Sequence, residues 1–333
     1  MVKLYKMNQS LYNRLYDFFM ISLGLLIESM PFVIIGVFIS SIIAVFVKSS
    51  KILEWKSKNR LISHIQAMFI GVFLPVCECG NIPLAKRLSM IGFKPSEVIT
   101  FMLAAPILNP LVLLTTLEAF NLDRNIGIIR VVGGGFIALT VGLMFSYHPN
   151  SDELMFPINK NLRKFGGFKQ AVTNENVSKN SLSSNIASTS SIGDNDSHNS
   201  QFVEVFREEF FAVFKVLVLG CVLAGLFQTL IPREFIQFFS SDPTLSIIAL
   251  MALAFVISIC SSVDAFFALS LASTFSLGSI ISFLAFGPMI DIKTLTMLKS
   301  VFKTKTLVTM TAIVAMLCFI LGMSVNTFYK IFY

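Results

Sequence analysis

Two short stretches of this apolar chain carry thiol and carboxyl groups where a membrane helix would otherwise continue. The first, PVCECGNIP, contains Cys77, Glu78 and Cys79 and directly follows the apolar run HIQAMFIGVFL. The second, SICSSVDAFFA, contains Cys260 and Asp264. Thiolates select soft metals and metalloids, and ionisable groups inside a membrane usually mark solute or proton pathways. The residue types therefore favour a binding site for a soft, thiophilic solute.

The spacing of the thiols indicates how the first stretch is built. Cys77 and Cys79 lie on one side of an extended segment but about 200° apart on a continuous helix. Gly80 tolerates unusual backbone angles and Pro83 lacks a backbone donor, which predicts an unwound segment here. Both thiols would then face one cavity, together with Cys260 from the second stretch. The alternative is that these small side chains only serve close helix packing.

The composition is that of an integral membrane protein. Apolar residues make up 55% of the 333 residues and charged residues 14%, and the mean hydropathy is +0.77. Soluble domains have about 45–50% and about 25%, respectively. The apolar runs are continuous rather than alternating, which favours helices over a β-barrel. The net charge of +7 indicates basic loops rather than a nucleic-acid surface. No cleavable signal pattern, Rossmann motif or P-loop is present in the sequence.

The apolar segments predict an all-α, polytopic membrane protein of about eight transmembrane helices. Two segments, 61–76 and 245–260, are short for a full crossing and end at the cysteine-bearing stretches. We therefore expect broken or re-entrant helices at the centre of the protein. The eight segments are 18–47, 61–76, 97–120, 126–146, 209–231, 245–260, 264–290 and 306–326.

A polar segment divides the chain into two apolar parts. It is rich in Ser and Asn from residue 174 to residue 201 and cannot bury enough apolar surface to order itself. The predicted organisation is a first transmembrane repeat at 1–147, a disordered Ser/Asn-rich linker at 148–206 and a second repeat at 207–333.

The two parts resemble each other in sequence. GFKPSEVITFMLAAPILNP in the first aligns at a constant offset with TFSLGSIISFLAFGPMIDIK in the second, starting with Gly92 opposite Thr274. The alignment pairs Pro106 with Pro288 and Asn109 with Asp291. Matching interruptions in two halves are typical of transporters with a central solute site. Asn109 and Asp291 either cap or end their helices or face the pore, and the sequence leaves these alternatives open.

Several charged residues fall inside or next to the apolar segments. Ionisable groups in spans are costly and usually functional, so Glu28 and Asp264 are candidates for proton coupling. A structural ion pair between Glu28 and Lys215 is the alternative. Glu97 is expected at the membrane interface. The basic segment from Lys293 to Lys305 is expected in a cytoplasmic loop.

The motifs CECGNIPLA, AAPILNP, CSSVDAFFA and GPMIDIK together make the chain resemble the bacterial permease family of the DUF318 and ArsP type. The resemblance covers nearly the whole chain and implies a multi-pass permease of the prokaryotic inner membrane with a repeated architecture. Some members of that family export trivalent organoarsenicals such as methylarsenite by thiol coordination. Carried over by motif, the candidate substrate-binding residues are Cys77, Cys79, Gly80, Pro83, Pro106, Asn109, Cys260, Asp264, Pro288 and Asp291.

Three functions are compatible with the sequence. The first is a permease that works by alternating access and exports a thiophilic solute. The second is a permease for a sulfur-containing or other small anion, in which the cysteines only pack. The third is a membrane thiol oxidoreductase using Cys77 and Cys79. Apart from that third function, the sequence predicts no catalytic residue; it predicts no cofactor, no bound metal and no nucleic-acid partner, only the lipid bilayer and a small-molecule or metalloid solute. The oligomeric state is not indicated.

Overall fold

The protein is all-helical in the part of the chain that the structure describes, and no β-strand forms there. The computed structural model describes residues 2–46, 57, 59–73, 78–120, 124–147, 194–230, 242–261, 263–272 and 274–332. In the first half the helices are α1 Val2–Phe46, α3 Arg60–Phe73, α4 Asn81–Ile91, α5 Pro95–Leu108, α6 Pro110–Ala119 and α7 Arg124–Ser146. In the second half they are α9 Asp194–Leu230, α11 Pro243–Ile257, α12 Asp264–Leu271, α13 Leu277–Met289, α14 Ile292–Leu298 and α15 Thr304–Phe332.

Six helical segments among the described residues are long and apolar enough to cross a membrane. Eight spans were predicted, and that number is not confirmed, because α3 and α11 are shorter than a bilayer requires. These two helices coincide with the short apolar segments of the sequence. The six candidate spans are Leu15–Ile43, Pro95–Ala119, Arg124–Ser146, Phe202–Thr229, Leu277–Leu298 and Thr304–Phe328.

Two of the six spans are broken by a polar residue that caps a new helix. Asn109 separates α5 from α6, and its side chain accepts a hydrogen bond from the Leu111 N–H. Asp291 separates α13 from α14, and its carboxylate accepts from the Thr294 N–H at 2.5 Å. Both residues satisfy backbone donors that a new helix leaves free. The sequence left open whether Asn109 and Asp291 cap their helices or face the pore, and in the structure both residues cap a helix.

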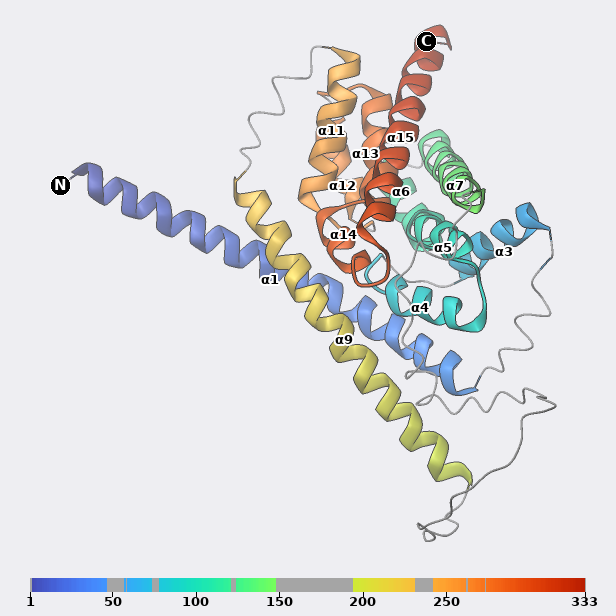
Figure 1. Ribbon diagram of the computed structural model, residues 1–333. Coiled ribbons are helices and arrows are strands. Elements are labelled where there is room, and N and C mark those ends of the chain that lie inside the picture. The colour runs from blue at the N-terminus through green and yellow to red at the C-terminus, as the bar shows by residue number, and fades with distance from the viewer. Residues whose placement is uncertain are drawn as a thin grey trace.

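The helices of each half pack in the same order. In the first half α5 lies between α3 and α7, and in the second half α13 lies between α11 and α15. The long helices α1 and α9 run side by side along one edge of the molecule (Figure 1). Contacts between α5 and α13 place the two broken spans next to each other at the centre.

The predicted linker and the structure differ at one end. Residues 148–193 lie outside the described part of the chain. Helix α9 begins at Asp194, so 194–206 is helical rather than linker. The sequence DNDSHNSQ at the start of α9 supplies Asp, Asn and Ser residues, which favour helix N-termini even though they read as linker composition.

The second interrupted stretch begins with an unusual backbone conformation. Ser258, the residue that follows α11, has φ 51° and is fully buried. The left-handed region is uncommon for a residue with a side chain and is held only where surrounding contacts require it. The Gln228 side chain of α9 donates a hydrogen bond to the Ile257 carbonyl, which the end of α11 leaves without a helical partner. Helix α9 therefore fixes the point at which the chain unwinds.

The first interrupted stretch is held against α1 by a close backbone contact. A Cβ atom at Gly36 of α1 would lie 2.5 Å from the carbonyl oxygen of Gly80. Only glycine allows this approach, so Gly36 sets the position of the turn that precedes α4.

Replacing Gly36 by alanine is expected to destabilise the protein by about 1–3 kcal/mol, because a backbone atom cannot move aside cheaply. Thermal unfolding of the purified protein in detergent measures the loss. Gly24→Ala is the matched control in the same helix, since a Cβ there meets no atom within 4 Å. Equal effects of the two substitutions would contradict the close contact.

Candidate functional site

The two interrupted stretches meet in the interior of the protein. The Ser261 hydroxyl donates a hydrogen bond to Glu78 Oε2 at 3.4 Å, across 183 residues of sequence. Both side chains are buried, and both residues belong to turns rather than helices. The structure thus brings together the segments that the sequence singled out, at Glu78 in the first and Ser261 in the second. Cys77 lies outside the described residues.

A buried ion pair joins the first stretch to the second half of the chain. The Lys293 Nζ lies 3.5 Å from Glu78 Oε1, and the two side chains are 1% and 2% exposed. Lys293 is the second residue of α14, directly after the break capped by Asp291. The break therefore positions the ammonium group beside the unwound segment.

In a second buried ion pair the base comes from the first half of the chain and the acid from the second. Arg130 of α7 contacts the Asp264 carboxylate at 2.5 Å, and the two side chains are 1% and 3% exposed. The guanidinium also donates to the Thr116 hydroxyl at 2.6 Å and to the Ser261 carbonyl at 3.5 Å. A residue of the first half therefore holds both Asp264 and the backbone of the second stretch.

The two ion pairs tie the halves of the chain together. In each pair the acid and the base come from different halves. An unpaired ion in an interior of low polarity costs several kcal/mol, so each charge requires its partner. Separation of the halves at this point would expose four buried charges, and we infer that these pairs fix the relative position of the two stretches in this conformation.

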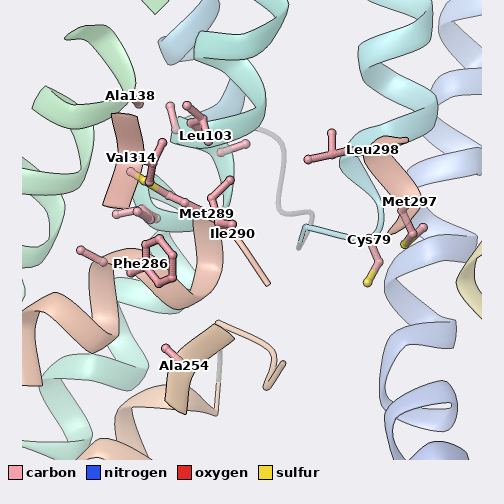
Figure 2. Close-up of a cluster of buried hydrophobic side chains, with 14 of the residues drawn as sticks. Cys79, Leu103, Ala138, Ala254, Phe286, Met289, Ile290, Met297, Leu298 and Val314 are labelled. Atoms are coloured by element: carbon pink, nitrogen blue, oxygen red, sulfur yellow. The ribbon is translucent and has the colours of Figure 1, made fainter. Parts of the chain in front are cut away.

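The ammonium group of Lys293 interacts electrostatically with three thiols. Cys79 and Cys260 lie within electrostatic range of it, and so does Cys221 of α9. Helix α9 approaches closely because a Cβ at Gly220 would lie only 3.2 Å from the Lys293 carbonyl oxygen. Cys79 belongs to a cluster of buried hydrophobic side chains (Figure 2). Among the described residues no group of three or more His, Cys, Asp or Glu side chains is arranged to hold a metal ion.

The other predicted site residues frame this centre. Gly80 is the residue before α4, and Pro83 lies in the first turn of α4. Pro106 and Pro288 lie inside α5 and α13, shortly before the two breaks. Asp291, besides its cap, has a second oxygen, Oδ2, that accepts no hydrogen bond in the described part of the chain.

One expectation about charged residues was wrong, and the structure adds detail to two others. Lys293 is not in a cytoplasmic loop but in the buried ion pair with Glu78. Glu97 lies in the first turn of α5, where it is buried, accepts from the Ser63 hydroxyl at 2.6 Å and caps the helix through the Lys94 N–H. Lys215 is exposed on α9, and no ion pair with Glu28 occurs among the described residues.

Sequence reasoning also missed Arg130. It is an isolated basic residue inside the apolar segment 126–146, which was the available signal. Lys293 gave a similar signal, because it follows the proline and aspartate of GPMIDIK by a few residues and is preceded by an apolar residue. Lys293 was assigned to a loop by its position between apolar segments, and Arg130 was given no role.

The six candidate spans among the described residues, together with a charged and interrupted centre, identify a multi-pass membrane protein. The ArsP_1 family, described as "Predicted permease", matches residues 14–327, and the chain belongs to this family. The resemblance drawn from the four sequence motifs is thereby confirmed.

Two curated relatives cover most of the chain. UPF0718 protein YcgR of Bacillus subtilis is 34% identical over 298 residues, which are 86% of this chain and 88% of that protein. A protein of Streptococcus mutans named "Putative two-component membrane permease complex subunit" is 28% identical over 312 residues, 91% of this chain and 94% of that protein. No solved structure matches the chain.

Removing one partner of a buried ion pair is expected to cost about 3–5 kcal/mol, and removing both much less. Arg130→Met and Asp264→Leu should therefore each lower the unfolding temperature in detergent strongly, and the double variant should recover most of the loss. The control is Arg87→Met, because the Arg87–Glu209 pair is 16% and 26% exposed and should contribute about 1 kcal/mol or less. A double variant as unstable as the single variants would contradict the pairing.

Proposed function

We propose that the protein is a permease of the prokaryotic inner membrane that moves a small solute by alternating access between two structural repeats. The contact between Glu78 and Ser261 carries this proposal, because it brings one unwound segment from each half to the same buried place. Unwound backbone at membrane depth is tolerated only where protein or a wet cavity surrounds it. Substrate sites of repeat transporters lie at such a meeting point.

Matching contacts support the repeat. Ser63 bonds Glu97 in the first half, and Ser246 bonds Ser279, the residue aligned with Glu97, in the second. These two bonds join α3 to α5 and α11 to α13. The two broken spans are thus anchored to their neighbours at equivalent places.

A second pair of contacts follows the same alignment. A Cβ at Gly142 would collide with the Thr100 hydroxyl, and one at Gly322 would collide with the Ser282 hydroxyl. Thr100 and Ser282 are again opposite each other in the alignment of the two halves. In both contacts a hydroxyl group of a broken span packs against a glycine of the long helix that follows it. Together with the two caps, they favour duplication of one structural unit.

Thiols beside the meeting point favour a thiophilic solute. Cys79 follows Glu78 in the chain, and Cys260 precedes Ser261, so both border the contact between the stretches. Soft metalloids bind thiolates more readily than hard ions do. Efflux of a trivalent organoarsenical such as methylarsenite, with Cys77 as a further ligand, is the most specific form of the proposal.

Proton coupling is proposed at Glu28 rather than at Asp264. Glu28 lies in the first span within electrostatic range of Lys293 and Glu78, and its Oε1 accepts no hydrogen bond among the described residues. Asp264 is already held in an ion pair by Arg130, so a proton on this carboxylate would disrupt that contact. Glu28 is therefore the carboxyl group that is better placed to exchange a proton as the halves move.

A second candidate function is transport of a small anion that contains sulfur. The observation that favours it is the pair of buried cations, Lys293 and Arg130, at the centre of the molecule. In this case the cysteines only pack. The third function, a thiol oxidoreductase, is not tested by the structure, because the Cys77 that it would use lies outside the described residues.

Replacing Cys79 or Cys260 by serine is expected to abolish most methylarsenite resistance and most uptake into everted membrane vesicles, because serine is a hard ligand. Cys318→Ser is the matched control, since Cys318 is buried in α15 and no charged group of the site acts on it.

Unchanged transport of methylarsenite in Cys77→Ser, Cys79→Ser and Cys260→Ser would remove the thiol mechanism. Transport of a sulfur-containing anion by a cysteine-free variant would then support the second candidate. Loss of all transport in Cys318→Ser as well would show that the substitutions act through folding, so expression and unfolding temperature are measured in parallel.

A further inference from the structure

A small cavity lies beside Glu78, between the broken spans and α15. Its size is about that of one water molecule. Three methionines from three helices line it, namely Met102 of α5, Met289 of α13 and Met310 of α15. Glu78 and Thr294 supply its polar wall. Met289 is part of the buried cluster that Figure 2 shows.

The hydrogen-bonding capacity of the cavity's polar wall is only partly used. Thr294 Oγ1 is buried and has no hydrogen-bond partner in the described part of the chain, and Glu78 Oε1 is engaged only by the ion pair with Lys293 at 3.5 Å. A buried polar atom without a partner costs about 1–3 kcal/mol, and native structures seldom contain one without a reason. The cavity is therefore built to receive something that interacts with oxygen on one side and with sulfur on the other.

We infer that this cavity binds one soft monovalent cation of the Cu(I) or Ag(I) type, held by the methionine sulfurs beside the ion pair of Glu78 and Lys293. Thioethers are ligands that select soft cations, whereas Ca²⁺ or Mg²⁺ requires about six oxygens and would find two residues able to give them. Around Lys293 stand three carboxyl groups, those of Glu28, Glu78 and Asp291, so the formal charge of the surroundings favours a cation.

The inference does not depend on the thiol mechanism. The sulfur atoms that it uses are thioethers on α5, α13 and α15, and none of the cysteines lines the cavity. Because those three helices include both broken spans, an occupied site would link the halves in addition to the ion pairs. The cation would then stabilise this conformation relative to one in which the spans separate.

The test is a titration of Ag⁺ into the full-length protein in detergent, with all five cysteines replaced by serine so that thiols do not bind the probe. We expect one Ag⁺ per chain by calorimetry and a rise in unfolding temperature. Replacing Met102, Met289 and Met310 together by leucine, which keeps the apolar volume, should remove both effects. Met297→Leu is the matched control, because Met297 is buried in the adjacent α14 and does not line the cavity.

Three results would overturn the inference. They are the absence of Ag⁺ binding by the cysteine-free chain, equal binding by the triple leucine variant, and equal binding of Na⁺. If the cysteine-free chain does not fold, the native chain is compared with its triple leucine variant, which should bind one Ag⁺ fewer. The transport assays of the cysteine variants test the thiol mechanism, and this titration tests the cation site. A negative result in one experiment therefore does not affect the conclusion from the other.

Discussion

Charge neutralisation in the interior is the constraint on which the structure depends. Arg130, Asp264, Glu78 and Lys293 are all buried in a chain whose composition places it in a membrane, and none of these ions is tolerable there alone. Because each acid is paired with a base from the other half, the ion pairs fix the relative position of the halves in this conformation. The broken spans, the turn at Ser261 and the close contact at Gly36 all serve to bring these groups within reach.

If the two halves are repeats of one unit, as we propose, their backbones are related but their charged residues differ. The alignment of the two halves, continued past Asn109 and Asp291, pairs the buried Lys293 with Leu111, which is exposed. Asp264 opens α12 as Asn81 opens α4, and only the former is charged. On this proposal, duplication accounts for the two breaks, and later divergence accounts for charges that are complementary rather than repeated. A centre with unlike halves can give a solute different contacts from each side.

The sequence was sufficient for features that depend on local chemistry. The apolar runs predict the helical class, and the helix-breaking residues within them predict the two interrupted stretches. The proline followed three positions later by a polar residue can be read from both halves of the sequence. The spacing did not decide whether Asn109 and Asp291 cap a helix or face a pore. Either role requires a polar side chain at the same position. Lys293 and Arg130 were missed because their partners are distant in the sequence. A basic residue next to a span is indistinguishable from a loop residue until its acid is located.

The most direct measurement tests whether the two stretches meet. Glu78 and Ser261 are replaced by cysteine in a chain without native cysteines, with Lys293→Met so that no lysine is left unpaired and a protease site placed between residues 160 and 190. The methylene-bridged bis-methanethiosulfonate should keep the two proteolytic fragments together on a non-reducing gel and release them on reduction. The control pair joins Ser261 to Phe136, an exposed residue of α7, and should give little product. Equal yields from the two pairs would contradict the meeting of the stretches.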